Sequence, residues 1–283
     1  MGRLAGSGRE TSGSEARDGG RLTLLRAVVE YDGTNFCGLQ YQPAVRTVAA
    51  ELEKRLRALL REDVKITAAG RTDAGVHATG QVVSFHTQAA FPFEKLGIAL
   101  NSELPKDLSV RDVTGVQTGF SARFSALERT YVYAMYARPE PSPLLARWAY
   151  HVWRPMDMER FLRGAAHLIG EHDFRSFCGM LPERGPTIRT VRHLSATRSG
   201  DLIRVEIRAD GFLHRMVRNI VGTLMECAAG KRDPDSIPQI LAAKDRSAAG
   251  LTAPPQGLYL AGVRYKDGFD SFKEPPVTLA CVE

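Results

Sequence analysis

Residues 64–85 read VKITAAGRTDAGVHATGQVVSF. The runs 64–68 and 81–86 alternate between apolar and polar side chains and predict two strands. The loop between them carries Asp73, with Arg71 two positions before it. Gly70 and Gly75 can adopt backbone angles that other residues resist, so this loop can turn sharply and let a ligand approach closely. An Asp-x-Gly sequence alone is typical of a surface turn, but the full Arg-Thr-Asp-x-Gly-x-His run is far less common.

The segments around this stretch complete a β-α-β-β-α-β order. An apolar run predicts a first strand at 24–30, and Thr47 can cap a helix that ends at Leu60. Pro92 suits the first turn of a second helix that ends near Ser102. A last strand follows at 108–113. This order is typical of a split ferredoxin-like unit.

A similar order returns in the second half of the chain. The predicted strands lie at 130–137, 190–197, 202–209 and 258–265, and the predicted helices at 156–169, 212–229 and 234–243. The fold class is therefore α+β, with two ferredoxin- or RRM-like halves whose antiparallel sheets meet at a central cleft. We expect a disordered tail at 1–21, the two halves at 22–118 and 119–266, and a C-terminal extension at 267–283.

Composition agrees with a soluble globular protein. The chain has 283 residues, of which 43% are hydrophobic and 25% charged, and no apolar run is long enough to span a bilayer. Nine of the first twenty residues are Gly or Ser, which is typical of a disordered tail. Four scattered cysteines indicate reduced thiols in a cytosolic protein. The formal net charge of +6 is compatible with a nucleic-acid partner.

Several catalytic classes lack their motifs. His77 follows Asp73 by four residues, but no second His or carboxylate pair stands nearby at a known metal-ligand spacing. A metal-dependent hydrolase that uses Asp73, His77 and Asp32 is thus an alternative with little support. The sequence contains no Gly-x-Ser-x-Gly elbow, no phosphate-binding Gly-Lys-Ser/Thr and no dinucleotide fingerprint.

Two other segments could serve a site. Tyr131 and Tyr133 project from one face of a predicted strand, either as a packing pair or as a stacking platform for a base. Phe120 and Arg123 precede them in a mixed aromatic and basic run, a composition found on surfaces that touch RNA.

The predicted helix at 212–229 places Arg218 close to its apolar stripe. A buried arginine must be paired because an unpaired charge in a core is costly. Asp73 is a candidate partner from the other half. Alternatively, the long stem of Arg218 carries its charge to solvent.

Six segments together resemble the TruA-type tRNA pseudouridine synthases. They occur in the family's order between about residues 24 and 265, at 31–40, 70–77, 129–133, 172–177, 211–222 and 253–260. The runs at 70–77 and 211–222 are the specific ones. One departure is Leu39, where the family usually has Trp; this position most simply packs.

The resemblance implies a pseudouridine synthase fold and an isomerase that converts uridine to pseudouridine in the anticodon stem-loop of tRNA, at positions 38–40. Asp73 would be the catalytic carboxylate, Tyr131 would stack on the base, and Arg218 would keep Asp73 ionised. The remaining implied contacts are Arg71 and Leu258 with the nucleotide, and Arg71, Phe120, Arg123 and Arg184 with RNA. The resemblance also implies a cytoplasmic homodimer without cofactor or metal. The alternative is a non-catalytic RNA-binding protein with two RRM-like units.

Overall fold

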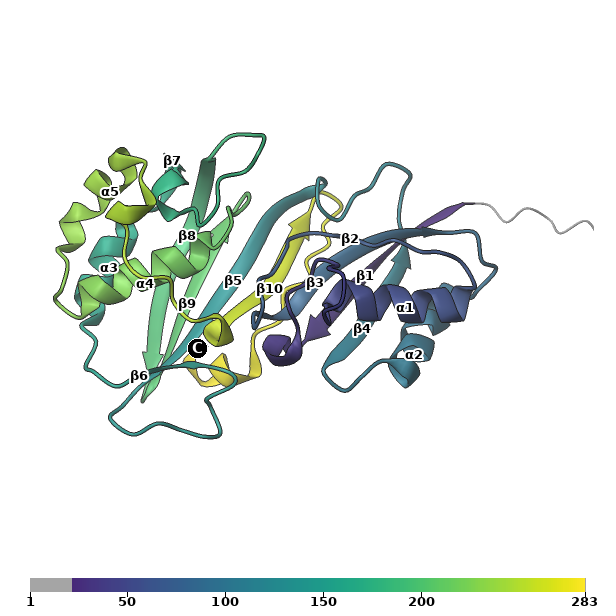
Figure 1. The fold of residues 1–283 in the computed structure, drawn as a ribbon, viewed down its shortest axis with the longest axis horizontal. Helices are drawn as coiled ribbons and strands as arrows, with labels where there is room; N and C mark the ends of the chain where they lie inside the picture. Colours follow the sequence, from purple (N-terminus) through teal and green to yellow (C-terminus); the bar gives the residue numbers. More distant parts are fainter. Residues whose placement is uncertain (1–21, 283) are drawn as a thin grey trace, which may run out of the picture.

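The computed structural model describes residues 22–282 and contains one ten-stranded sheet (Figure 1). Eight strands follow the order β4-β1-β3-β10-β5-β9-β8-β7, while β2 pairs with β3 and β6 pairs with β5. The tail expected at 1–21 and the last residue, Glu283, lie outside the described residues. No helix within 22–282 has the length and apolar character required to cross a membrane.

The N-terminal half has the strand order of a ferredoxin-like unit. Its elements are β1 (Thr23–Tyr31), α1 (Val48–Leu60), β2 (Thr67–Ala68), β3 (His77–Thr87), α2 (Phe93–Glu103) and β4 (Leu108–Gly115). Their spatial order β4-β1-β3-β2 is antiparallel throughout. Helix α1 begins where its sequence predicts, because the Thr47 side chain accepts a hydrogen bond from the Ala50 N–H.

The C-terminal half repeats this order. Its elements are β5 (Ala126–Ala137), β6 (Tyr150–Val152), α3 (Met158–Ala166), β7 (Gly170–Asp173), β8 (Ile188–Ser199), β9 (Leu202–Ala209), α4 (Met216–Ala228), α5 (Ile237–Ala243) and β10 (Leu258–Tyr265). The order β10-β5-β9-β8 matches β4-β1-β3-β2, strand for strand. The predicted α+β class is confirmed. The halves are joined by residues 116–125, and the predicted boundary at 118/119 falls within this connection.

The two half-sheets merge at a parallel contact between β3 and β10, which pairs Tyr259 with His77 and Leu260 with Ala78. In Figure 1 these strands lie between α1 and α2 on one side and α3, α4 and α5 on the other. The main core lies between the sheet and these helices. A smaller cluster includes Tyr136 and Tyr259 and lies on the opposite face, because successive strand residues alternate between faces.

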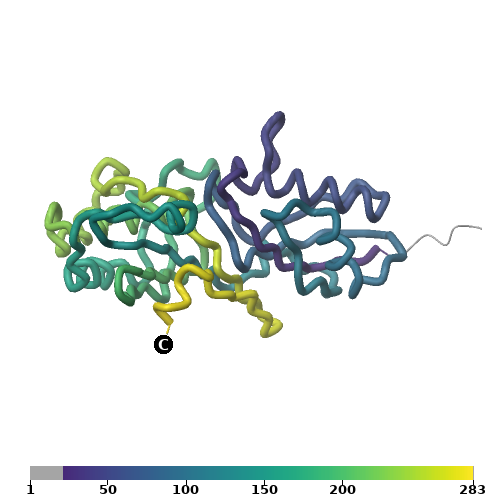
Figure 2. Tube along the Cα trace, turned by 90° about the horizontal axis from the view of Figure 1, so that it is seen from below, coloured from purple at the N-terminus to yellow at the C-terminus, as the bar shows by residue number. Residues whose placement is uncertain are grey.

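The C-terminal segment crosses the seam and binds both halves (Figure 2). The Ser271 hydroxyl donates to the Gly80 carbonyl over 2.7 Å, and Arg204 of β9 pairs with Glu274 at 2.7 Å. Gly80 is required here, because a Cβ at this position would lie 2.2 Å from the Ala261 carbonyl oxygen. The described part of the expected C-terminal extension, 267–282, therefore packs on the sheet and contacts both halves.

Two strands begin earlier than predicted, β3 at His77 rather than at 81 and β5 at Ala126 rather than at 130. Three other predicted limits are wrong for identifiable reasons. The strand expected at 64–68 is reduced to Thr67–Ala68, because the Ile66 N–H bonds to the Glu53 side chain instead of to a strand. The helix expected from residue 212 begins at Met216, because Arg215 has a left-handed φ of 58°. Helix α3 begins at Met158 rather than at 156, because Asp157 is its N-cap and accepts a hydrogen bond from the Arg160 N–H.

Candidate active site

Asp73 lies in the loop between β2 and β3, and the residue before it is fixed by the N-terminal half. Thr72 is buried, and its hydroxyl lies 2.8 Å from the Tyr31 hydroxyl, while its carbonyl accepts from the Leu39 N–H. Gly38 has a φ of 87°, and a Cβ there would lie 2.8 Å from the Thr72 carbonyl oxygen. The loop is thus anchored immediately beside its carboxylate.

Arg218 of α4 meets Asp73 from the other half. Its Nη1 donates to Asp73 Oδ2 over 2.9 Å, and its Nε donates to the Ala253 carbonyl over 2.7 Å. The Arg218 side chain is 12% exposed and that of Asp73 26% exposed. Arg218 is therefore held by two partners and does not extend to solvent, while Asp73 stays accessible. The sequence predicted that a buried Arg218 needs a charged partner and named Asp73 as a candidate, and the structure contains this contact.

Two further basic side chains approach Asp73 from the residues that precede α4. His214 Nε2 lies 3.6 Å from Asp73 Oδ1, and Arg215 Nε lies 3.9 Å from Oδ2. The positive end of the α4 dipole adds to the attraction for an anion. The sequence prediction missed both residues, because it treated 212–215 as helix. Their signal was the presence of three basic residues within 214–218.

Tyr131 of β5 lies beneath the same loop. It is 7% exposed, and its ring packs edge-on against Phe212 with centroids 5.0 Å apart. A Cβ on Gly70 would lie 3.6 Å from its hydroxyl. Burial raises the pKa of Tyr131, and the nearby charge of Asp73 adds to this increase, so the phenol is neutral at physiological pH. Tyr131 therefore presents a neutral hydroxyl near the loop.

The other candidate residues are spread over the surface and core. Arg71, Arg123 and Arg184 are exposed. Phe120 is partly buried against Tyr265, with ring centroids 5.1 Å apart. Leu258 is buried and pairs with Tyr133, whereas it is Leu260 that pairs with Tyr131. The structure thus unites Asp73, Tyr131 and Arg218, with Arg71 two residues from Asp73.

Tyr133 has a packing role, as one of the two interpretations of its strand predicts. Its hydroxyl donates to the Pro254 carbonyl over 2.7 Å. Gly257 lies against its ring, since a Cβ there would come within 2.8 Å of ring carbons. Tyr133 thereby supports the segment that also supplies the Ala253 carbonyl to Arg218.

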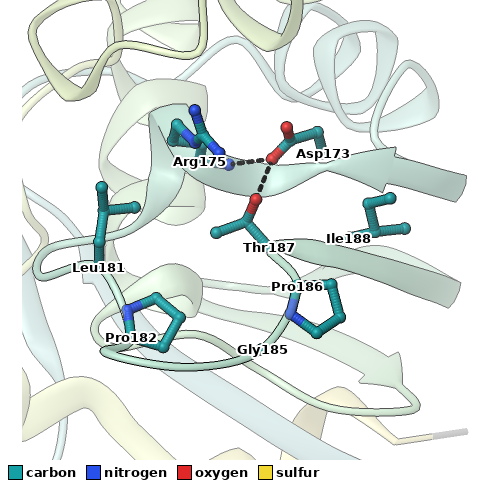
Figure 3. A pocket seen from close by; sticks show the side chains of 8 residues that line it. All are labelled: Asp173, Arg175, Leu181, Pro182, Gly185, Pro186, Thr187 and Ile188. Atoms are coloured by element: carbon teal, nitrogen blue, oxygen red, sulfur yellow. Dashed lines mark hydrogen bonds between the residues drawn. The ribbon is translucent and has the colours of Figure 1, made fainter.

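A loop at 178–187 borders the site next to His214. The Gly179 N–H donates to the His214 carbonyl over 2.8 Å. Farther along, this loop encloses a cavity of about 310 Å³ lined by Asp173, Arg175 and Leu181, among others (Figure 3). Asp173 uses its carboxylate to accept from Thr187 and from the Arg175 backbone, so it closes the base of the loop. Asp73 does not line this cavity.

Arg129 connects three segments around the site through backbone carbonyls. Its guanidinium donates to Ala69 before the Asp73 loop at 3.1 Å, to Asp210 before α4 at 2.7 Å, and to Arg123. Burial lowers the pKa of Arg129. Carbonyl oxygens stabilise this charge, and they fix the spacing between the loop that carries Asp73 and the segment that leads to Arg218.

His77 and Asp32 are structural. His77 Nδ1 accepts from the Gly33 N–H over 3.0 Å, so the ring proton is on Nε2, which donates to the Arg147 carbonyl over 3.0 Å. Asp32 pairs with Arg147 at 2.6 Å. Across residues 22–282, no cluster of three or more His, Cys, Asp or Glu side chains could hold a metal ion. The donor set therefore does not support the hydrolase interpretation.

Comparison with known proteins identifies the chain's relatives. A family model described as tRNA pseudouridine synthase matches residues 27–125 and 165–266, which include Asp73 and Arg218. The tRNA pseudouridine synthase A of Halalkalibacterium halodurans is 45% identical over 231 residues, which cover 81% of this chain and 88% of the relative. The enzyme of that name from Salmonella arizonae is 44% identical over 254 residues, covering 89% and 94%. A crystal structure of a Cbf5-Nop10-Gar1 complex aligns with a TM-score of 0.32 and 11% identity over 71% of this chain and 45% of that chain.

We expect His77 to make the stability of the fold depend on pH. Burial lowers the pKa of His77 below 6.5, although the charge of Asp32 partly opposes this shift. The unfolded chain then binds the proton more readily, so this stability is fully present above about pH 6.5 and is lost as the pH falls below it. Urea unfolding of the wild type and His77→Gln at about pH 7.5 and about pH 5.5 measures the difference. His77→Gln should show the smaller loss, whereas His86→Gln, at an exposed position, should match the wild type.

Arg129→Met should destabilise the fold, because it leaves several carbonyls around the site without a donor. Each unsatisfied buried group costs roughly 1–3 kcal/mol, so we expect a decrease of at least about 2 kcal/mol in the free energy of unfolding. Arg71→Met, which removes an exposed arginine from the adjoining loop, is the matched control and should change stability little. Equal effects of the two substitutions in urea titrations would contradict the bridging role.

Proposed function

The chain belongs to the tRNA pseudouridine synthase family, and we propose that it isomerises uridine to pseudouridine in tRNA with Asp73 as its catalytic carboxylate. The observation that carries the assignment of Asp73 is its ion pair with Arg218. A carboxylate that is held by an arginine from the opposite half, and yet is partly exposed, can be charged, oriented and reachable at once. The α+β fold agrees with the pseudouridine synthase fold.

The reaction rearranges one nucleotide. The bond from N1 to C1′ breaks, the uracil turns over, and C5 forms a new bond to C1′, while the hydrogen leaves C5 and N1 gains one. No electrons are gained or lost, so the overall change requires no redox cofactor. Asp73 can serve it by attack on C1′, by addition to C6 or by removal of a ribose proton. All three routes use the carboxylate form of Asp73, whose Oδ2 accepts a hydrogen bond from Arg218.

Tyr131 and Arg71 are the proposed contacts of the target nucleotide. The base is stacked in the RNA, so it must be extruded at a cost of about a few kcal/mol. Arg71 is exposed two residues from Asp73, where it can contact the extruded nucleotide or its phosphate. Tyr131 would meet the base through its exposed part, beside the Asp73 loop. Leu258, which is buried against Tyr133, would act only as part of the apolar wall behind it.

RNA would be positioned by exposed basic side chains at the edges of the site. Arg71, Arg123 and Arg184 are exposed, and Phe120 supports the segment that carries Arg123. Such contacts act mainly on phosphates and give affinity without sequence information. We propose the anticodon stem-loop, positions 38–40, as the region modified.

We also propose a cytoplasmic homodimer. Leu144 and Trp153 are large exposed apolar side chains on either side of β6, a feature that a partner subunit could cover. The cysteines at 37, 178, 227 and 281 are free thiols, the state that a reducing compartment maintains. A tRNA substrate is consistent with that compartment.

Asp73→Asn should abolish the release of tritium from tRNA labelled at C5 of uridine, measured in EDTA. The substitution preserves shape but removes the charge, and we expect turnover to fall by at least about 10²-fold, the lower end of what a positioned acid or base contributes. Binding of tRNA should stay near that of the wild type. Asp201→Asn, in an exposed turn, is the control.

Each rival makes a different prediction in this assay. A non-catalytic RNA-binding protein would bind tRNA but release no tritium even as the wild type. A metal-dependent hydrolase would also release no tritium, because hydrolysis leaves the C5–H bond intact, and its hydrolytic activity would be lost in EDTA and regained with a divalent ion. Full turnover by Asp73→Asn would reject Asp73 as the catalytic group.

Arg218→Ala should lower turnover strongly while the protein stays folded. Without Nη1 and Nε, the Asp73 carboxylate loses its anchor, and a displacement of about 1 Å can cost about 10²-fold in rate. Arg218→Lys retains a charge near Asp73 but loses the bond to Ala253, so its turnover should be intermediate. Single-turnover rates together with circular dichroism test this order. Equal rates for wild type and Arg218→Ala would mean that the ion pair does not assist the reaction.

A further inference from the structure

A second cavity lies where β4 ends, β5 begins and β10 ends. Its volume is about 760 Å³, within the range typical of ligand sites. It is lined by aromatic side chains and cations, among them Phe120, Phe124, Tyr265, Arg26 and Lys266. Asp73 does not line it, and none of the contacts that form the active site accounts for it.

Arg26 lines this cavity and is only partly satisfied by its neighbours. Its side chain is 9% exposed, with Nη1 paired to Asp267 at 2.7 Å and its guanidinium carbon 3.5 Å from the centre of the Phe269 ring. Its Nε is buried without a hydrogen-bond partner among residues 22–282. An arginine left incompletely satisfied in a buried position calls for an explanation. Lys266 is exposed beside it, so the wall keeps a net positive charge after Asp267 is paired.

Phe124 forms an exposed rim of the cavity. At 80% exposure it is the most exposed aromatic residue in the described part of the chain, and the Arg123 guanidinium lies 5.1 Å from its ring centre. Deeper in, Phe120 packs on Tyr265. Aromatic faces beside cations are the surfaces on which proteins stack unpaired bases and hold their phosphates. The chemistry therefore matches a nucleotide better than an apolar ligand.

The rim is connected to the active site through Arg129. This residue donates both to the carbonyl of Arg123, next to Phe124, and to that of Ala69, before the Asp73 loop. Arg129 thus bonds both to the segment that carries Phe124 and to the segment that leads to Asp73.

We propose that this cavity binds one unpaired nucleotide of the RNA substrate, with its base against Phe124 and its phosphate near Arg26 and Lys266. The inference rests on the proposed function, since it takes tRNA as the ligand. It adds a second point of attachment, distinct from the nucleotide that reacts.

Phe124→Ala tests the stacking contact by the Kd for tRNA, measured by filter binding. Loss of one stacked base should raise the Kd at least about 5-fold. Phe124 is exposed, so the variant should fold. The control is Ile98→Ala, which removes a side chain of similar exposure from α2 and should leave the Kd unchanged. An unchanged Kd for Phe124→Ala, or an equal increase in the control, would overturn the proposal.

Lys266→Ala tests the phosphate contact. The slope of log Kd against log salt concentration should decrease in magnitude by about one unit. A slope equal to that of the wild type would overturn the proposed contact between Lys266 and a phosphate.

Free uridine monophosphate distinguishes the source of the nucleotide. The proposal expects weak binding of the mononucleotide at most, and a large effect of Phe124→Ala on tRNA. Tight mononucleotide binding that Phe124→Ala abolishes, with tRNA binding intact, would instead identify a small-molecule site and overturn the proposal. Tritium release by the wild type is measured separately, so a failure of the proposed function would be recognised independently of these binding results.

Discussion

The parallel contact between β3 and β10 determines the geometry of the whole site. It joins Tyr259 to His77 and Leu260 to Ala78. The Asp73 loop ends where β3 begins, and Tyr131 pairs with Leu260 across β10 and β5. A displacement at this seam would therefore move the carboxylate relative to the tyrosine and to α4. His77, stacked on Tyr259 with ring centroids 4.8 Å apart and bonded at both nitrogens, fixes the position of the seam.

Two charged side chains, Asp73 and Arg129, form the polar contacts that connect the segments of the site. The Asp73 carboxylate is paired with Arg218 and lies close to Arg215 and His214, all from the other half. Arg129 donates its hydrogen bonds to backbone carbonyls, and these dipoles stabilise its positive charge in place of a carboxylate. The difference has a physical consequence. Asp73 can exchange its partners for substrate, whereas loss of Arg129 would leave backbone acceptors unsatisfied in three segments.

The sequence predicted features that depend on local patterns. Strand β10 has the predicted limits, and Thr47 caps α1 as expected. The contact between Asp73 and Arg218 was also accessible, because a charge beside an apolar stripe demands a partner. Features set by tertiary contacts were not accessible. The left-handed Arg215 brings His214 toward Asp73, and no propensity predicts a positive φ for arginine. Likewise, the bridging role of Arg129 depends on carbonyls from segments far apart in sequence.

The positive φ of Arg215 shows how the C-terminal half shapes the start of α4. A non-glycine residue with a φ of 58° persists only where surrounding contacts stabilise it. Here the Gly179 N–H binds the His214 carbonyl, and a Cβ on Gly179 would lie 3.1 Å from Arg215 Cδ, so the 178–187 loop confines this turn closely. If the turn relaxed into a regular helix, α4 would extend toward the Asp73 loop and would redirect the His214 side chain. The irregular start of α4 is therefore what allows three basic groups to converge on one carboxylate.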